Sequence, residues 1–126
     1  MKVKVSEALG VVLDWMVAKC EGCDLSWDEN AEDFFMGLNS PYCFLREFSP
    51  STNWYQGGPI IKQLRSDSAY QFLIESDGDN VHVLSWPSEH VHFSGYGPTI
   101  LIATMRCLVT SRLGEEVEVP DELLKT

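Results

Sequence analysis

Residues 95–114 read GYGPTILIATMRCLVTSRLG and contain an uninterrupted apolar run, Ile100–Ala103, that no other run of the chain exceeds in length. From residue 100 to residue 113 the apolar side chains occupy most of the circumference of a helix, which predicts a helix buried on several sides. Pro98 suits a first helical position, glycine is tolerated at a cap, and Gly114 ends the helix. Arg106 lies inside this apolar stretch, so its charge must be paired or must reach solvent.

A second helix is predicted near the N-terminus. Residues 3–5 fit a short strand, and Ser6 is a suitable N-cap for a helix at residues 7–20. Gly22 follows this helix and can end it. The apolar positions that repeat with helical spacing are Leu9, Leu13, Met16, Val17 and Cys20.

Alternating apolar and polar residues predict strands in the second half of the chain. Two antiparallel strands at residues 69–75 and 81–86 flank a turn at Asp77–Asn80, and residues 91–93 fit a third short strand. Residues 115–119 alternate as well and fit an edge strand that Pro120 stops.

The segment between the first helix and these strands is harder to assign. Ser26–Glu29 fits a capping box and predicts a short helix at residues 27–37. Residues 39–60 are rich in turn residues and also in aromatic residues, so we expect a long loop that packs down on the domain. The order of all these elements favours an α+β fold, with a small antiparallel sheet packed against two main helices.

Length and charge limit the class of protein. The chain has 126 residues, so we expect a single domain spanning residues 1–126. It carries 9 Lys+Arg against 19 Asp+Glu, a net charge of −10. Such a surface repels phosphate, so we expect no direct nucleic-acid binding and no binding to anionic membranes. Neither a membrane-spanning run nor a signal-peptide pattern is evident, and we therefore expect a cytoplasmic protein.

Cysteine and histidine residues offer only weak signs of chemistry. Cys20 and Cys23 form a C-x-x-C, which for zinc needs two more ligands, formally His90 and His92. A redox pair requires its first cysteine at a helix N-terminus, whereas Cys20 ends a helix. The histidines also lie near serines in the sequence, but no Gly-x-Ser-x-Gly elbow is present. We assign no metal ligand, no cofactor and no catalytic residue, and we favour a protein that is not an enzyme.

Two glycine-containing segments, 56–59 and 95–99, fit a small-ligand site. The second abuts a helix N-terminus, whose free N–H groups can bind an anion, and nearby aromatic rings can stack on a planar ligand. The same residues also fit ordinary turns and core aromatics. The candidate ligand-binding residues are Trp54, Tyr55, Gln56, Gly57, Gly58, Tyr96, Gly97, Thr99 and Arg106.

An acidic segment at residues 21–33 suggests a different function. An acidic patch of this kind can mimic nucleic acid and occupy a basic groove of another protein. It can equally be a solvated face that keeps a small protein soluble. The acids of this segment are Glu21, Asp24, Asp28, Glu29, Glu32 and Asp33, with no base among them.

Three stretches of the sequence combine into a family pattern. They are MKVKVSE (1–7) with LDWMVAKC (13–20), SPSTNWYQGGPII (49–61), and GPT (97–99) continued through MR (105–106) to GEEVEVPDEL (114–123). In order and spacing these stretches resemble the NinX-like family of small phage proteins. The resemblance implies a phage or prophage accessory protein made in the bacterial cytoplasm, and it carries over no catalytic residue.

Three hypotheses follow. The first is a non-enzymatic binding protein that sequesters a small anionic ligand, such as a signalling nucleotide, or otherwise counteracts a host system. The second is an acidic inhibitor of a host protein that mimics nucleic acid. The third is a small metal-dependent hydrolase that uses the histidines. Exposed aromatic residues on a short sheet would need cover, which is compatible with a homo-oligomer.

Overall fold

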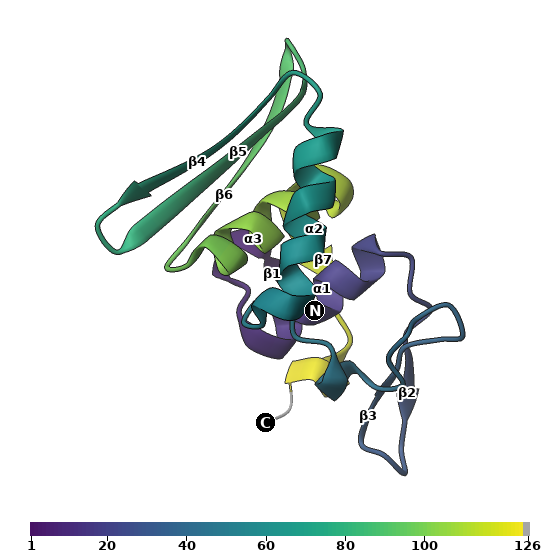
Figure 1. The fold of residues 1–126 in the computed structure, drawn as a ribbon. Helices are drawn as coiled ribbons and strands as arrows, with labels where there is room; N and C mark the ends of the chain where they lie inside the picture. Colours follow the sequence, from purple (N-terminus) through teal and green to yellow (C-terminus); the bar gives the residue numbers. More distant parts are fainter. Residues whose placement is uncertain (125–126) are drawn as a thin grey trace.

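The helix predicted at residues 100–113 is α3 (Ile100–Leu113), and it lies at the centre of the computed structural model, which describes residues 1–124 (Figure 1). Every residue from Leu101 to Val109 is buried, including Arg106. The Thr99 side chain caps the helix by accepting a hydrogen bond from the Ile102 N–H at 3.1 Å. Pro98 therefore precedes the cap and does not occupy the first helical position that we predicted.

The predicted hairpin and third strand form a three-stranded antiparallel sheet in the order β4 (Gln71–Asp77), β5 (Asn80–Ser88) and β6 (Val91–Gly97). One face of β5 and β6 packs against α3. At Gly95 a Cβ atom would collide with the backbone of α3 at Ala103 and Cys107. The absent side chain thus lets strand and helix approach closely.

The N-terminal helix begins later than predicted. α1 spans Gly10–Cys20, and a short 3-10 helix, η1 (Val5–Glu7), precedes it. Ser6 lies inside η1 and is not the cap that we predicted, because extended backbone at Ala8 and Leu9 separates η1 from α1 and Leu9 is the N-cap of α1. β1 (Lys2–Lys4) pairs with β7 (Glu116–Glu118), which confirms a strand near residues 115–119 and joins the two ends of the described chain.

The predicted helix at residues 27–37 is wrong. The segment forms a hairpin of β2 (Ser26–Asp28) and β3 (Asp33–Phe35). The Asp28 carboxylate accepts hydrogen bonds from the N–H groups of Asn30 and Ala31, which favours a turn over a helix. The Trp27 and Phe34 rings meet edge to face across the two strands, with centroids 5.2 Å apart.

The end of the predicted loop at residues 39–60 is helical instead. α2 spans Trp54–Asp67, and a short 3-10 helix, η2 (Leu45–Glu47), precedes it. The Asn53 side chain caps α2 by accepting a hydrogen bond from Tyr55 N–H at 2.9 Å. Pro59 lies inside the helix and cannot donate to the carbonyl four residues earlier. That carbonyl belongs to Tyr55, an exposed residue near the helix start, so water can take the place of the missing donor.

One hydrophobic core joins these elements. It includes residues of α1, α3 and β5 and extends to the final 3-10 helix, η3 (Asp121–Leu124). The three-stranded sheet and the β2–β3 hairpin project from opposite ends of the helical body (Figure 1). The α+β prediction is confirmed, with α2 added to the two helices that we expected.

Candidate functional site

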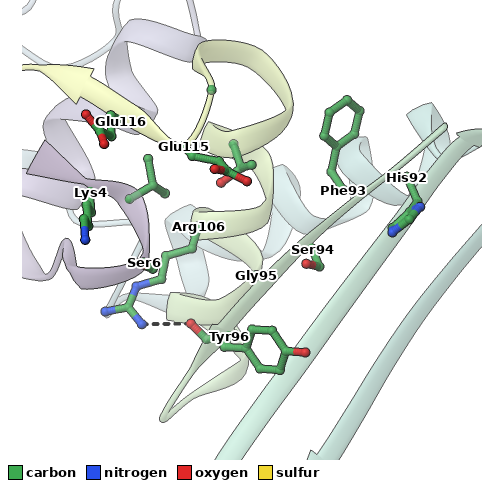
Figure 2. A pocket seen from close by; sticks show the side chains of 13 residues that line it. Lys4, Ser6, His92, Phe93, Ser94, Gly95, Tyr96, Arg106, Glu115 and Glu116 are labelled. Atoms are coloured by element: carbon green, nitrogen blue, oxygen red, sulfur yellow. Dashed lines mark hydrogen bonds between the residues drawn. The ribbon is translucent and has the colours of Figure 1, made fainter.

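A cleft of about 780 Å³ lies where η1 and β1 approach β6, above α3 (Figure 2). Its walls come from segments far apart in the sequence, because β1 and β7 pair beside α3. Its polar and charged lining residues are Lys4, Ser6, His92, Ser94, Tyr96, Arg106, Thr110, Glu115 and Glu116.

The Arg106 side chain lines the cleft and is only 8% exposed. Its Nε and Nη2 donate to the Ala8 carbonyl at 3.1 and 2.9 Å, and its Nη1 donates to the Tyr96 carbonyl at 2.8 Å (dashed in Figure 2). Burial lowers the pKa of this guanidinium from its usual value. The side chain therefore links η1 to β6 and holds its charge in a fixed orientation.

Arg106 has no acidic partner in the described chain. Within residues 1–124 no carboxylate lies within 4.0 Å of its guanidinium nitrogens. A guanidinium has five N–H groups, and the three hydrogen bonds to carbonyls leave two of them free. This arrangement leaves a buried positive charge that a bound anion could neutralise.

The cleft carries charges of both signs. Lys4 of β1 lies directly opposite Glu116 in the β1–β7 register, and Glu115 precedes Glu116 in the chain. Because directly opposite residues of an antiparallel pair lie on the same face, Lys4 and Glu116 are neighbours. The cleft therefore combines the cations Arg106 and Lys4 with two carboxylates.

The structure separates the candidate ligand residues into two groups. Tyr96 and Arg106 line the cleft. Gly97 packs under Ile102 at the start of α3, and Thr99 occupies its own helix N-terminus as the cap. These contacts give Gly97 and Thr99 structural roles beside the cleft.

The group on α2 lies outside this cleft. Trp54 and Tyr55 are exposed on the first turn of α2, and Gly57 packs against Leu101 of α3. The Gln56 side chain accepts from Ser49 N–H and donates to the Glu47 carbonyl, so it holds the preceding turn together. Gly58 has open space around it.

The Tyr96 and His92 rings make stacking contacts on the outer face of the sheet. The Tyr96 ring stacks on His82 of β5, with centroids 3.9 Å apart, and points away from the Arg106 guanidinium (Figure 2). His92 lies beside Trp86 on the same outer face of the sheet, at 5.6 Å between centroids. Of the aromatic residues that the sequence suggested for stacking on a planar ligand, Tyr96 therefore lies on the outer face of the sheet, and Trp54 and Tyr55 lie on α2.

Seven charged or polar lining residues were not predicted from the sequence as ligand residues. They lie in the first and last parts of the chain, in β6 and in α3, and only the pairing of β1 with β7 brings the terminal ones together. No local motif marks them, so sequence reasoning had no signal for them. They are Lys4, Ser6, His92, Ser94, Thr110, Glu115 and Glu116.

A second cleft, of about 430 Å³, lies between the β2–β3 hairpin and η3. Its apolar surface comes from Val11, Trp27, Phe34 and Leu123. Its acidic lining residues are Glu29, Glu32, Asp33 and Glu122.

The four cysteines are free thiols. Burial raises the pKa of Cys20 to about 12 and raises that of Cys23, which makes neither a ready thiolate. Among the described residues, no group of three or more His, Cys, Asp or Glu side chains is placed to hold a metal ion. No helix within residues 1–124 has the length and apolar character needed to cross a bilayer.

The fold and the cleft define a small α+β domain with a buried, carbonyl-bound arginine at a surface cleft. The family model described as "Bacteriophage P22, NinX" matches residues 4–112, and the chain therefore belongs to the NinX family of phage proteins. This confirms the resemblance seen in the sequence. No curated protein matches the chain.

Proposed function

We propose that this NinX-family protein is a non-enzymatic binding protein of the bacterial cytoplasm that sequesters a small anionic ligand in the cleft at Arg106, and thereby counteracts a host system. A signalling nucleotide fits the proposed ligand class. The observation that carries the proposal is the buried guanidinium of Arg106, which faces a cleft, keeps two free N–H groups and has no carboxylate within reach in residues 1–124. Because a buried unpaired charge is costly, binding an anion there would recover free energy.

Two other lining residues, Lys4 and Ser6, support an anion bound near Arg106. Lys4 would strengthen the attraction, and the Ser6 hydroxyl could donate a hydrogen bond to the ligand. Amino groups elsewhere on the ligand could donate to Glu115 or Glu116, as exocyclic amines of a nucleobase do.

The test is a thermal-shift and calorimetric titration of the full chain with cyclic and linear nucleotides, with inorganic phosphate alongside. A ligand at about 100 times its dissociation constant stabilises the folded state by about 2.7 kcal/mol, which raises the melting temperature by several degrees. Lys4→Ala should raise the dissociation constant of that ligand by about fivefold, whereas the matched exposed variant Lys62→Ala should leave it unchanged. If no anion in the panel shifts the melting temperature, or if both variants bind equally, the proposal fails.

A second candidate function is inhibition of a host protein by the acidic surface. The supporting observation is that the acids Glu29 and Glu32 surround an apolar cleft at Trp27, and no Lys or Arg lines it. A basic segment carrying an apolar side chain would fit such a surface.

The matching experiment is capture of host proteins by the full chain at increasing salt concentration. The double variant Glu29→Lys with Glu32→Lys should lose a captured basic protein, and Asp79→Lys with Glu89→Lys should retain it at the same net charge. Asp28 and Asp33 are kept, because Asp28 accepts turn N–H groups and Asp33 pairs with Arg46 at 3.0 Å. Equal capture by both double variants would exclude this function.

A further inference from the structure

The outer strand of the three-stranded sheet, β4, is an unprotected edge. The order β4-β5-β6 leaves one side of β4 without a partner strand in residues 1–124. β4 is seven residues long, QFLIESD, and pairs with β5 without a bulge from Gln71 to Asp77. It contains neither proline nor lysine, two of the residues with which proteins commonly block edge strands.

β4 also carries apolar side chains that the rest of the domain covers only in part. Phe72 and Ile74 lie on the face of the sheet that packs against α3, beside Ser85 and Val83 of β5. β5 and β6 pack on α3, but β4 lies outside them (Figure 1), so Ile74 is 41% exposed. Leu73 lies on the opposite face beside Leu84, where no helix packs.

We propose that the chain forms a homodimer in which β4 pairs antiparallel with β4 of a second copy, giving one continuous six-stranded sheet. An antiparallel pair across a two-fold axis must place residues of the same face opposite each other. With Leu73 on the axis, Leu73 faces Leu73 of the second copy and Phe72 faces Ile74. The exposed apolar residues of β4 thus cover one another.

The charges of β4 fit this register. The acids Glu75 and Asp77 are both in the C-terminal half of the strand, so antiparallel pairing places Glu75 opposite Gln71 of the second copy, whose amide can donate to the carboxylate. Moving the axis to Ile74 would instead place Glu75 opposite Leu73. The register centred on Leu73 therefore pairs apolar with apolar residues and never sets two carboxylates directly opposite each other.

The net charge of −10 per chain adds a second expectation. Two such chains repel each other, and salt screens that repulsion. The dimer should therefore become tighter as the ionic strength rises, whereas an interface held by ion pairs would weaken. The cleft at Arg106 lies beyond β6, the opposite edge of the sheet, so it stays open in the dimer.

The test is the mass of the full chain by sedimentation and by native mass spectrometry over a range of concentrations. The wild-type protein should give a mass twice the 14.2 kDa of one chain. Leu73→Lys and Leu73→Glu should each raise the dimer dissociation constant at least tenfold, because each sets two like charges on the axis. The matched control Tyr55→Lys, on the 88% exposed side chain of α2, should leave the dimer intact.

Mixing the two charged variants tests the register itself. Leu73→Lys and Leu73→Glu should form a mixed dimer, because opposite charges then meet on the axis. Circular dichroism of each variant verifies that the monomer is folded. A wild-type monomer at all concentrations, unaltered dimers in both variants, or no mixed dimer from folded variants would overturn the proposal.

Discussion

Arg106 and Asp14 are both charged residues buried in helices of the same core, yet their surroundings differ. Arg106 in α3 donates to two carbonyls and lines a cleft, so its free N–H groups can meet a ligand. Asp14 in α1 is 4% exposed and accepts one backbone hydrogen bond, from Ser51 N–H at 2.9 Å. Burial raises the pKa of Asp14 from its usual 3.8 to about 6, although the Ser51 bond opposes the shift.

The two buried charges differ in what their surroundings leave accessible. In the proposed function an anion binds at Arg106, because the protein orients the guanidinium and leaves two of its N–H groups without a carbonyl partner. The Asp14 carboxylate is buried, and by accepting the Ser51 N–H it connects the turn before α2 to α1. The first charge should affect binding and stability, and the second should affect stability as a function of pH.

The largest expected effect is at Arg106. Arg106→Met keeps most of the side-chain volume but removes the donors to the Ala8 and Tyr96 carbonyls, which should lower the free energy of unfolding by about 3 kcal/mol. Urea denaturation measures this value. Arg112→Met is the control, because Arg112 forms a half-exposed pair with Asp67 and an exposed hydrogen bond to the Cys20 carbonyl, and their loss should cost less than about 1 kcal/mol. Equal losses of unfolding free energy in both variants would contradict the expected difference between the buried Arg106 and the surface Arg112.

The next effect is the pH dependence at Asp14. Because its folded pKa lies above its unfolded pKa, the folded state binds the proton more tightly, and stability falls as the pH rises from about 4 to about 6. A shift of this size corresponds to about 3 kcal/mol at most. Asp14→Asn keeps an acceptor for Ser51 N–H and should be more stable than the wild type at pH 8 but not at pH 3.

Urea denaturation at several pH values checks this difference. Asp24→Asn serves as the control, since Asp24 is exposed and should change stability equally at each pH. A wild-type protein whose stability relative to Asp14→Asn stays constant from pH 3 to pH 8 would contradict the prediction.

The smallest expected effect is at Asn53, which follows the turn that is hydrogen-bonded to Asp14. Asn53→Ala removes the cap of α2 and should lower the free energy of unfolding by about 1 kcal/mol. Since no titratable group makes this bond, the loss should be the same at pH 4 and pH 8. Thermal melts at both values test it, and a pH-dependent loss would mean that the cap and Asp14 are coupled.

The elements predicted correctly from the sequence have strong periodic patterns. α3 is apolar on most sides, and β4 and β5 alternate around a turn at Asp77–Asn80, so local spacing was sufficient. The largest errors fall between residues 21 and 67, and smaller ones concern Ser6 and Pro98 at the starts of two helices. A capping-box pattern suggested a helix at residues 27–37. The start of α2 was missed because it contains Gly57, Gly58 and Pro59, which are typical of turns.

The candidate site was predicted only in part. Arg106 was noticed because a charge inside an apolar helix needs a partner, and Tyr96 because it precedes that helix. Lys4 and Glu115 could not be found, because more than a hundred residues separate them and only the β1–β7 pairing unites them.

By itself the sequence determined the central helix, the hairpin sheet, the acidic charge and the family resemblance, because each of these depends on neighbouring residues or on composition. Only the tertiary structure decided which charges are buried, which segments line the clefts and which strand is left at an edge. Those features depend on contacts between segments distant in the chain, and the spacing of residues along it does not encode them in any local pattern.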